Sequence, residues 1–204
     1  WVNFSNDGKY VVTASSDRTV KIWSVPGGQL IRELKGHTDK VRTVQYTNDD
    51  KYIISAAWDS TAKIWDASNG NLVRELKGHK GSLNAALVSP DGKHITTTSM
   101  DNTARIWLMA NGTMEHELKA HTNSITSAHY SRDGKRIVLA SWDNTASVWD
   151  TESGNMLFKL SDHTASLKSA AFSPERNFIV TTSEDNTLKK WNAISGELLY
   201  TFFA

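Results

Sequence analysis

Short runs of β-branched and aromatic residues, roughly alternating with polar residues, follow one another along the whole chain. Residues 41–47 (VRTVQYT) and 51–57 (KYIISAA) are two such runs, and their composition and alternation predict β-strands. Turn signals separate the runs, as in the motifs NDGK, PDGK and RDGK and in the Asn-Gly and Ser-Gly pairs further along. No stretch has a helical pattern, so the sequence predicts an all-β protein with short antiparallel strands.

The pattern recurs every 42 residues without an insertion, which predicts five copies of one structural unit. Each copy contains four expected strands. A small antiparallel sheet cannot bury both of its faces alone, so the copies are expected to stack face to face. The expected units cover residues 1–36, 37–78, 79–120, 121–162 and 163–204.

Two dipeptides characterise the repeat. Gly-His occurs at residues 36–37 and 78–79, and Trp-Asp occurs at residues 65–66 and 149–150. With these motifs at this spacing, the chain resembles the WD-repeat family of β-propellers over nearly its whole length. The dipeptides vary in the other copies, but the periodic histidine, aspartate and tryptophan remain. The resemblance implies five propeller blades of four antiparallel strands each.

Aligned on the period, the sequence starts within an innermost strand and stops with an outermost strand. The resemblance implies a ring of about seven blades, which the family usually closes with a blade built from both chain ends. That overlap is missing, so we expect an arc whose missing blades come from the rest of a longer chain or from self-association. A closed ring of five blades is the alternative. An open arc would leave two apolar blade faces exposed.

Histidine, serine, aspartate and tryptophan recur in the same order, and a Ser-His-Asp set is also the composition of a hydrolase triad. An active site is built once, whereas this set recurs together with an indole, so we interpret it as structural. The resemblance implies a buried hydrogen-bonded chain that links the strands of each blade. Its expected members are His37, Asp59, Trp65, His79, Ser99, Asp101, Trp107, His121, Ser141, Asp143, Trp149, His163, Ser183, Asp185 and Trp191.

The second copy departs from this set, because Ala57 stands where the other copies have serine. We expect its hydrogen-bonded chain to be one hydroxyl short, unless Ser55 on the same strand face substitutes. Three further histidines, His94, His116 and His129, lie outside the periodic series. Zinc needs three or four converging ligands, so we expect no metal site and no cofactor.

Charge and composition exclude several classes of partner. The chain has 23 basic and 22 acidic side chains, a balance that does not predict a nucleic-acid-binding face. No apolar run approaches the roughly 18 residues that span a bilayer. The chain has no cysteine, which excludes disulfides and thiolate metal sites and fits a cytoplasmic location.

The resemblance implies a rigid platform for protein–protein interaction. The sequence contains no phosphate-binding loop and no metal-ligand spacing, so we expect a scaffold and not an enzyme. A propeller enzyme would gather charged residues on its innermost strands, which here carry only Arg42, Lys168 and His129. Another alternative is a regulatory or targeting propeller attached to a peptidase-like domain beyond residue 204, because the stretch LLYTFFA resembles such a joint in some bacterial WD-repeat arrays.

The position before the turn aspartate varies from copy to copy and therefore indicates a surface. It holds serine, tryptophan, methionine, tryptophan and glutamate in turn, which a core position would not accept. The resemblance places it on the face around the central channel, beside the start of each innermost strand. Aromatic and basic residues there are typical of an interface and favour an acidic partner. The expected partner-binding residues are Trp58, Trp142, Met100, Lys40, Arg42, Asn84, Lys168 and Glu184. The alternative is that Trp58 and Trp142 only cover neighbouring side chains.

Overall fold

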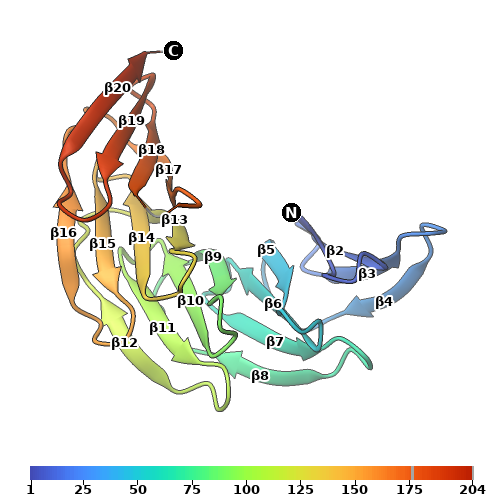
Figure 1. Cartoon of the computed structure of the whole chain (residues 1–204). Helices are drawn as coiled ribbons and strands as arrows, with labels where there is room; N and C mark the ends of the chain where they lie inside the picture. The colour runs from blue at the N-terminus through green and yellow to red at the C-terminus, as the bar shows by residue number, and fades with distance from the viewer. Residues whose placement is uncertain (176, 204) are drawn as a thin grey trace.

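Twenty strands in five separate sheets make up the computed structural model, which describes residues 1–175 and 177–203 (Figure 1). Each sheet contains four consecutive antiparallel strands, and we number the sheets as blades 1 to 5 in chain order. The prediction of an all-β fold with four-stranded blades is confirmed. The strands are β1 (Val2–Phe4), β2 (Tyr10–Ala14), β3 (Val20–Ser24) and β4 (Leu30–Leu34) in blade 1; β5 (Val41–Tyr46), β6 (Tyr52–Ala57), β7 (Ala62–Asp66) and β8 (Leu72–Leu76) in blade 2; β9 (Leu83–Val88), β10 (His94–Ser99), β11 (Ala104–Leu108) and β12 (Met114–Leu118) in blade 3; β13 (Ile125–Tyr130), β14 (Arg136–Ser141), β15 (Ala146–Asp150) and β16 (Met156–Leu160) in blade 4; and β17 (Leu167–Phe172), β18 (Phe178–Ser183), β19 (Thr187–Asn192) and β20 (Leu198–Phe203) in blade 5.

Tight turns join the strands within each blade, and their sequences fit the backbone they need. Gly8, Gly92 and Gly134 have φ between 70° and 73° in the turns after the first strand of their blades. Glycine adopts this left-handed conformation without a steric cost. In blade 2 the same place is held by Asp50, at φ 58°. Residue 204, at the end of the fifth expected blade, lies outside the described residues.

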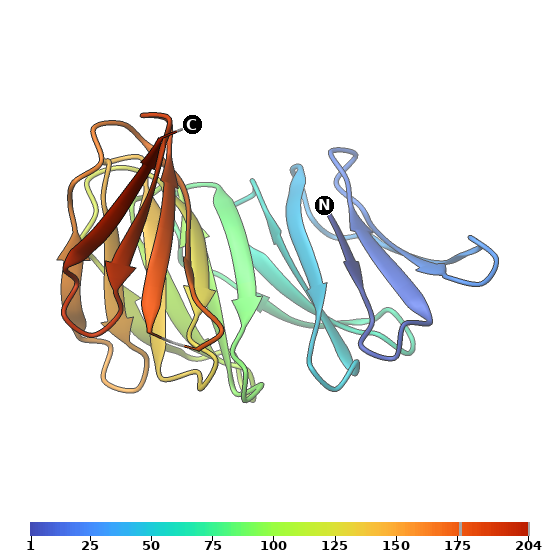
Figure 2. The ribbon, with the colours of Figure 1, turned by 45° about the horizontal axis from the view of Figure 1, so that its top comes forward.

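The core lies between blades and not within them. One cluster of buried side chains joins Ile64 of β7 and Leu76 of β8 to Leu83 of β9 and Trp107 of β11. Blades 2 to 4 therefore bury one face against the preceding blade and the other against the following blade, whereas blades 1 and 5 each have one neighbour. Figure 2 shows the sheets side by side along an arc, with the first strand of each blade on the inside and the fourth strand on the outside.

The arc is open (Figure 1). Its two end faces carry exposed aromatic side chains. Phe4 in β1 is 61% exposed, whereas Tyr46, which takes the same place in blade 2, is 7% exposed. At the other end, Phe202 in β20 is exposed, whereas the corresponding Leu160 is buried. The number of blades in a complete ring, and the source of any further blades, stay predictions.

Candidate partner-binding surface

Two tryptophans of blade 4 stand seven residues apart and have opposite environments. Trp149 lies in β15, is 5% exposed and donates its indole N–H to Ser147 Oγ at 2.7 Å. Trp142 lies in the turn between β14 and β15 and is 43% exposed. An exposed indole leaves a large apolar surface in contact with water unless another molecule covers it. Trp142 is therefore a surface residue, and Trp149 is a core residue.

The backbone brings the two predicted sets of surface positions together. In blades 2 to 5 the residue before the turn aspartate donates its backbone N–H to a carbonyl just before the first strand of the same blade. The bond from Trp58 to Lys40 is 2.9 Å long, and that from Trp142 to Ser124 is also 2.9 Å. The equivalent bonds join Met100 to Ser82 and Glu184 to Ser166. The variable residues thus stand next to the innermost strands, at the end of the blades where β2–β3-type turns lie.

Trp58 differs from Trp142 in how much of it is accessible. Its side chain is half-buried, and Lys40 Nζ lies 4.9 Å from the centroid of its ring, within the range of a cation–π contact. Its indole nitrogen is buried and finds no hydrogen-bond acceptor among the described residues. Trp58 thus partly covers its neighbours, as the alternative interpretation expects, but leaves one strong donor unused.

The other predicted surface residues fall into three groups. Met100 is 40% exposed and Arg42 is exposed on β5. Lys168 and Glu184 are both exposed and form an ion pair with each other within blade 5. Asn84 instead joins two blades, because its side-chain amide donates to Ser124 Oγ and to the carbonyl of Ile125, each at 2.9 Å. Arg42, Met100 and Trp142 are therefore the groups most available to a partner.

A hydrogen-bonded chain runs through the inside of each of blades 2 to 5. In blade 2, Trp65 Nε1 donates to Ser55 Oγ at 2.8 Å, and that oxygen lies 2.8 Å from His37 Nε2. His37 Nδ1 lies 2.8 Å from Asp59 Oδ2, which also accepts the backbone N–H of Thr38. A neutral histidine with its proton on Nδ1 satisfies every member, because Ser55 then accepts from the indole and donates to Nε2.

The same chain joins equivalent residues in the other blades, but its hydroxyl is not the predicted serine. Ser99, Ser141 and Ser183 form no hydrogen bond with the histidines among the described residues, so the prediction that their hydroxyls meet the histidines is wrong. In blades 2, 3 and 5 the hydroxyl bonded to the histidine belongs to the residue two positions before the turn-serine position on the second strand. In blade 4 it belongs to the residue that pairs with that position from the third strand. The hydroxyl oxygens that link indole to imidazole belong to Ser55, Thr97, Ser147 and Thr181.

The predicted serines have a different task beside the turn. Ser141 Oγ donates to the carbonyl of Asn123 at 3.0 Å and accepts the backbone N–H of Asp143 at 3.1 Å. Ser99 and Ser183 make the same two bonds in their blades. Ala57 therefore removes this turn bond from blade 2, and the indole–imidazole chain there is complete. Two series of serine or threonine residues recur every 42 residues on the second strand of the blades, two positions apart. The sequence predicts a hydroxyl in the chain, but it does not show which of the two series supplies it.

Burial and hydrogen bonding set the charge states in these chains. Burial lowers the pKa of His121 despite the opposing hydrogen bond to Asp143. Burial alone would raise the pKa of Asp143, but hydrogen bonds from Thr145 and His121 outweigh it and the pKa lies below its usual value. These opposing effects of burial and hydrogen bonding favour a neutral imidazole beside an ionised carboxylate. The imidazole N–H can then donate to the carboxylate and so join the segments that carry the two residues.

The histidines outside the periodic series have local partners. His94 Nε2 lies 2.9 Å from Glu115 Oε2, and His116 Nε2 contacts the carbonyl of Glu152. His129 Nδ1 accepts the backbone N–H of Phe172 at 3.3 Å. Within residues 1–175 and 177–203, no three histidine, cysteine or acidic side chains converge to hold a metal ion. Among the same residues, no helix has the length and apolar character needed to cross a membrane.

Comparison with known proteins supports the repeat assignment. The family described as "WD domain, G-beta repeat" matches residues 1–24, 28–66, 70–107, 112–150 and 154–192. A short segment is similar to "Nuclear distribution protein PAC1-2" of Postia placenta, with 51% identity over 35 residues. That match covers 17% of this chain and 8% of the relative, so it spans roughly one repeat of a much longer protein.

Proposed function

Because the chain belongs to the WD-repeat family, whose members generally act as protein-interaction scaffolds, we propose that it binds a peptide or protein loop. The proposed site is the surface of Arg42, Met100 and Trp142, with Trp58 and Lys40 at its edge. The observation that carries the proposal is the 43% exposure of Trp142 in a hydrogen-bonded turn of an otherwise well-packed blade. Rigid exposed aromatics bind at low entropic cost, because little conformational freedom remains to be lost.

The charges of this surface favour an acidic partner. Lys168 is neutralised by Glu184, but Arg42 forms no ion pair with any described residue. Lys40 lies on the ring of Trp58 and not against a carboxylate. We therefore propose that an acidic side chain binds near Arg42 and Lys40 while an apolar side chain lies on Met100 and Trp142. The unused indole N–H of Trp58 would donate to the same partner if Lys40 moved aside to meet the acidic group.

Selection from a displayed library of random peptides tests this proposal, because such a library offers acidic and apolar residues in every combination. The enriched peptides should combine an acidic residue with an apolar one, and Trp142→Ala should weaken their binding by at least about tenfold, as for an interface hot spot. Arg42→Gln should weaken binding at low salt more than at high salt. Ile194→Ala is the matched control, because Ile194 is 79% exposed in a turn at the opposite end of the strands.

The result that would contradict the proposal is equally specific. Selected peptides that bind Trp142→Ala and the Trp58→Ala/Trp142→Ala double variant as tightly as the original protein would place the site elsewhere. A double variant that unfolds as readily as Trp149→Ala would show that both tryptophans belong to the core.

A further inference from the structure

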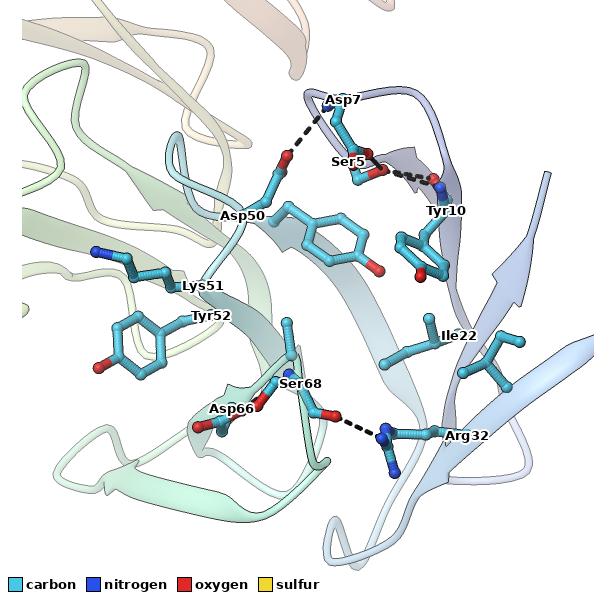
Figure 3. A pocket seen from close by; sticks show the side chains of 13 residues that line it. Ser5, Asp7, Tyr10, Ile22, Arg32, Asp50, Lys51, Tyr52, Asp66 and Ser68 are labelled. Carbon is cyan, nitrogen blue, oxygen red and sulfur yellow. Dashed lines mark hydrogen bonds between the residues drawn. The ribbon is translucent and has the colours of Figure 1, made fainter.

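A pocket of about 600 Å³ lies between blades 1 and 2 (Figure 3). Its lining includes the β1–β2 turn, at the end of the strands opposite the β14–β15 turn that holds Trp142. Tyr10, Ile22 and Arg32 contribute from blade 1, and Tyr46 and Ala67 contribute from blade 2. This volume is in the range of pockets that hold small organic ligands. None of these residues belongs to the proposed partner-binding surface, so the pocket is a separate feature of the molecule.

Comparison with the next pair of blades shows why the pocket is open. Met109 of blade 3 takes the place that Ala67 has in blade 2, and it packs against the core between blades 2 and 3. The cavity that Met109 lines there is only about 200 Å³. The repeat therefore accepts a large side chain at this place, and the short side chain of Ala67 leaves the space between blades 1 and 2 empty.

One polar group that lines the pocket has no hydrogen-bond partner among the described residues. Tyr46 is 7% exposed, and its hydroxyl forms no hydrogen bond with any described residue. Tyr130 takes the same place in blade 4, where its hydroxyl lies 2.6 Å from Thr96 Oγ1 of blade 3. Blade 1 has Val12 where blade 3 has Thr96, so Tyr46 has no hydroxyl to meet. Burial raises the pKa of Tyr46 to about 12, which keeps its hydroxyl a neutral donor.

The charged groups of the pocket leave a cation available. The Arg32 guanidinium donates to the carbonyl of Ser68 and forms no ion pair with a described residue (Figure 3). Three carboxylates also line the pocket, and none of them pairs with Arg32: Asp7 accepts the backbone N–H of Lys9, Asp50 accepts those of Asn6 and Asp7, and Asp66 accepts that of Ser68. A guanidinium has five N–H donors in a planar fork that matches a carboxylate.

We propose that this pocket binds an organic carboxylate with an aromatic or branched apolar body. The body lies against Tyr10 and Ile22, the carboxylate binds Arg32, and Tyr46 donates its hydroxyl to an acceptor on the ligand. The ligand is a free small molecule or the carboxyl-terminal residue of a peptide, which share this chemistry. The inference does not depend on the proposed function, because the two sites lie at opposite ends of the strands.

Fluorine NMR with para-fluorophenylacetate, and with its uncharged amide as the matched probe, tests the charge requirement. The carboxylate should bind more tightly than the amide. Arg32→Gln should remove this difference, whereas Arg74→Gln, at the equivalent place in blade 2, should leave it intact. Tyr46→Phe should weaken binding about fivefold, the usual effect of losing one hydrogen bond. Ala67→Met should abolish binding, because it introduces the side chain that occupies the next groove.

Thermal unfolding separates a ligand site from a purely structural role. Tyr46→Phe should leave the melting temperature unchanged, because the hydroxyl has no partner in the protein. Tyr130→Phe should lower it, because Thr96 then loses its bond. A short peptide ending in phenylalanine that displaces the probe only with a free carboxyl terminus identifies a protein tail; failure to displace it identifies a small molecule. Absence of carboxylate binding at millimolar concentration, or undiminished binding to Ala67→Met, would overturn the proposal.

Discussion

Blades 2 and 4 build the same hydrogen-bonded chain from different strands. In blade 2 the hydroxyl is that of Ser55 on β6, and Lys63 lies opposite it on β7. In blade 4 the residue on the second strand is Leu139, and the hydroxyl is that of Ser147 directly opposite on β15. The oxygen lies 2.7–2.8 Å from both the indole and imidazole nitrogens in both blades.

The exchange also moves a positive charge. Lys63 on β7 pairs with Glu75 on β8 in blade 2. In blade 4 Ser147 has replaced the lysine, and Lys159 on β16 stands where Glu75 stands, with its Nζ 3.9 Å from Asp143 Oδ2. The requirement is thus for one hydroxyl oxygen at one point in space, and either of two cross-strand partners can supply it. A buried donor must have an acceptor, but the strand that carries the acceptor is free to change.

The largest effect should follow loss of the turn aspartate. Asp59→Ala and Asp143→Ala should each lower the free energy of unfolding by about 3–5 kcal/mol, because each leaves a buried imidazole N–H and a partly buried threonine hydroxyl without an acceptor. The two losses should be similar, since the chain of blade 2 is complete. Denaturant titration measures both; a markedly smaller loss for Asp59→Ala would restore the idea that Ala57 weakens this chain.

A next, smaller effect should follow loss of the linking hydroxyl. Ser147→Ala should cost about 2–4 kcal/mol, because the Trp149 indole N–H and His121 Nε2 both lose their partner. Adding Leu139→Thr to Ser147→Ala gives blade 4 the arrangement of blades 3 and 5, and should recover part of this loss. Leu139→Thr alone is the control, and it should destabilise the protein by removing buried apolar volume. A double variant no more stable than Ser147→Ala would show that the strands do not exchange the hydroxyl freely.

The period, the strands and the fold class follow from the sequence, because they rest on features that every copy repeats. The identity of the linking hydroxyl does not follow in the same way. Ser99, Ser141 and Ser183 form a uniform series that is easily recognised in the sequence. The position of the linking hydroxyl instead holds threonine, serine, threonine, leucine and threonine in blades 1 to 5. In blade 4 this position holds Leu139, and Ser147 on the neighbouring strand supplies the hydroxyl. A pattern along the chain does not show which residues pair across strands.

The surface and the pocket depend on side-chain packing, which the repeat only partly determines. The exposure of Trp142 follows from its variable position, but Trp58 at the equivalent position is half-buried and has Lys40 over its ring. The pocket depends on Ala67 and Val12, two small differences between blades that lie in different strands. The difference between Ala67 and Met109 is visible in the aligned repeats, and becomes informative only once the blades are known to pack at that place.

Acid should weaken the chains of blades 3 and 4. Burial lowers the pKa values of His79 and His121 in the folded protein, so the unfolded chain binds more protons as the pH falls below about 6.5. Their contribution to stability is thus present above the unfolded pKa and is lost as the pH falls through the folded pKa. Denaturant titrations at neutral and mildly acidic pH should show this loss, and His121→Gln should reduce its size. An equal loss in His121→Gln would assign the pH dependence to other groups.

The smallest effect concerns the serine beside the turn, which is Ser141 in blade 4 and is replaced by Ala57 in blade 2. Ser141→Ala should cost about 1–2 kcal/mol, because it removes the bonds to the Asn123 carbonyl and the Asp143 backbone N–H but leaves the indole–imidazole chain intact. Ala57→Ser should supply the same bonds to blade 2 and stabilise it by up to about 1 kcal/mol, since Ala57 is fully buried and a hydroxyl there must find its partners. Denaturant titration of both variants measures the turn bond separately from the buried chain. If Ser141→Ala cost as much as Ser147→Ala, the two serine positions would have to act as one unit, and the distinction between the turn bond and the linking hydroxyl would fail.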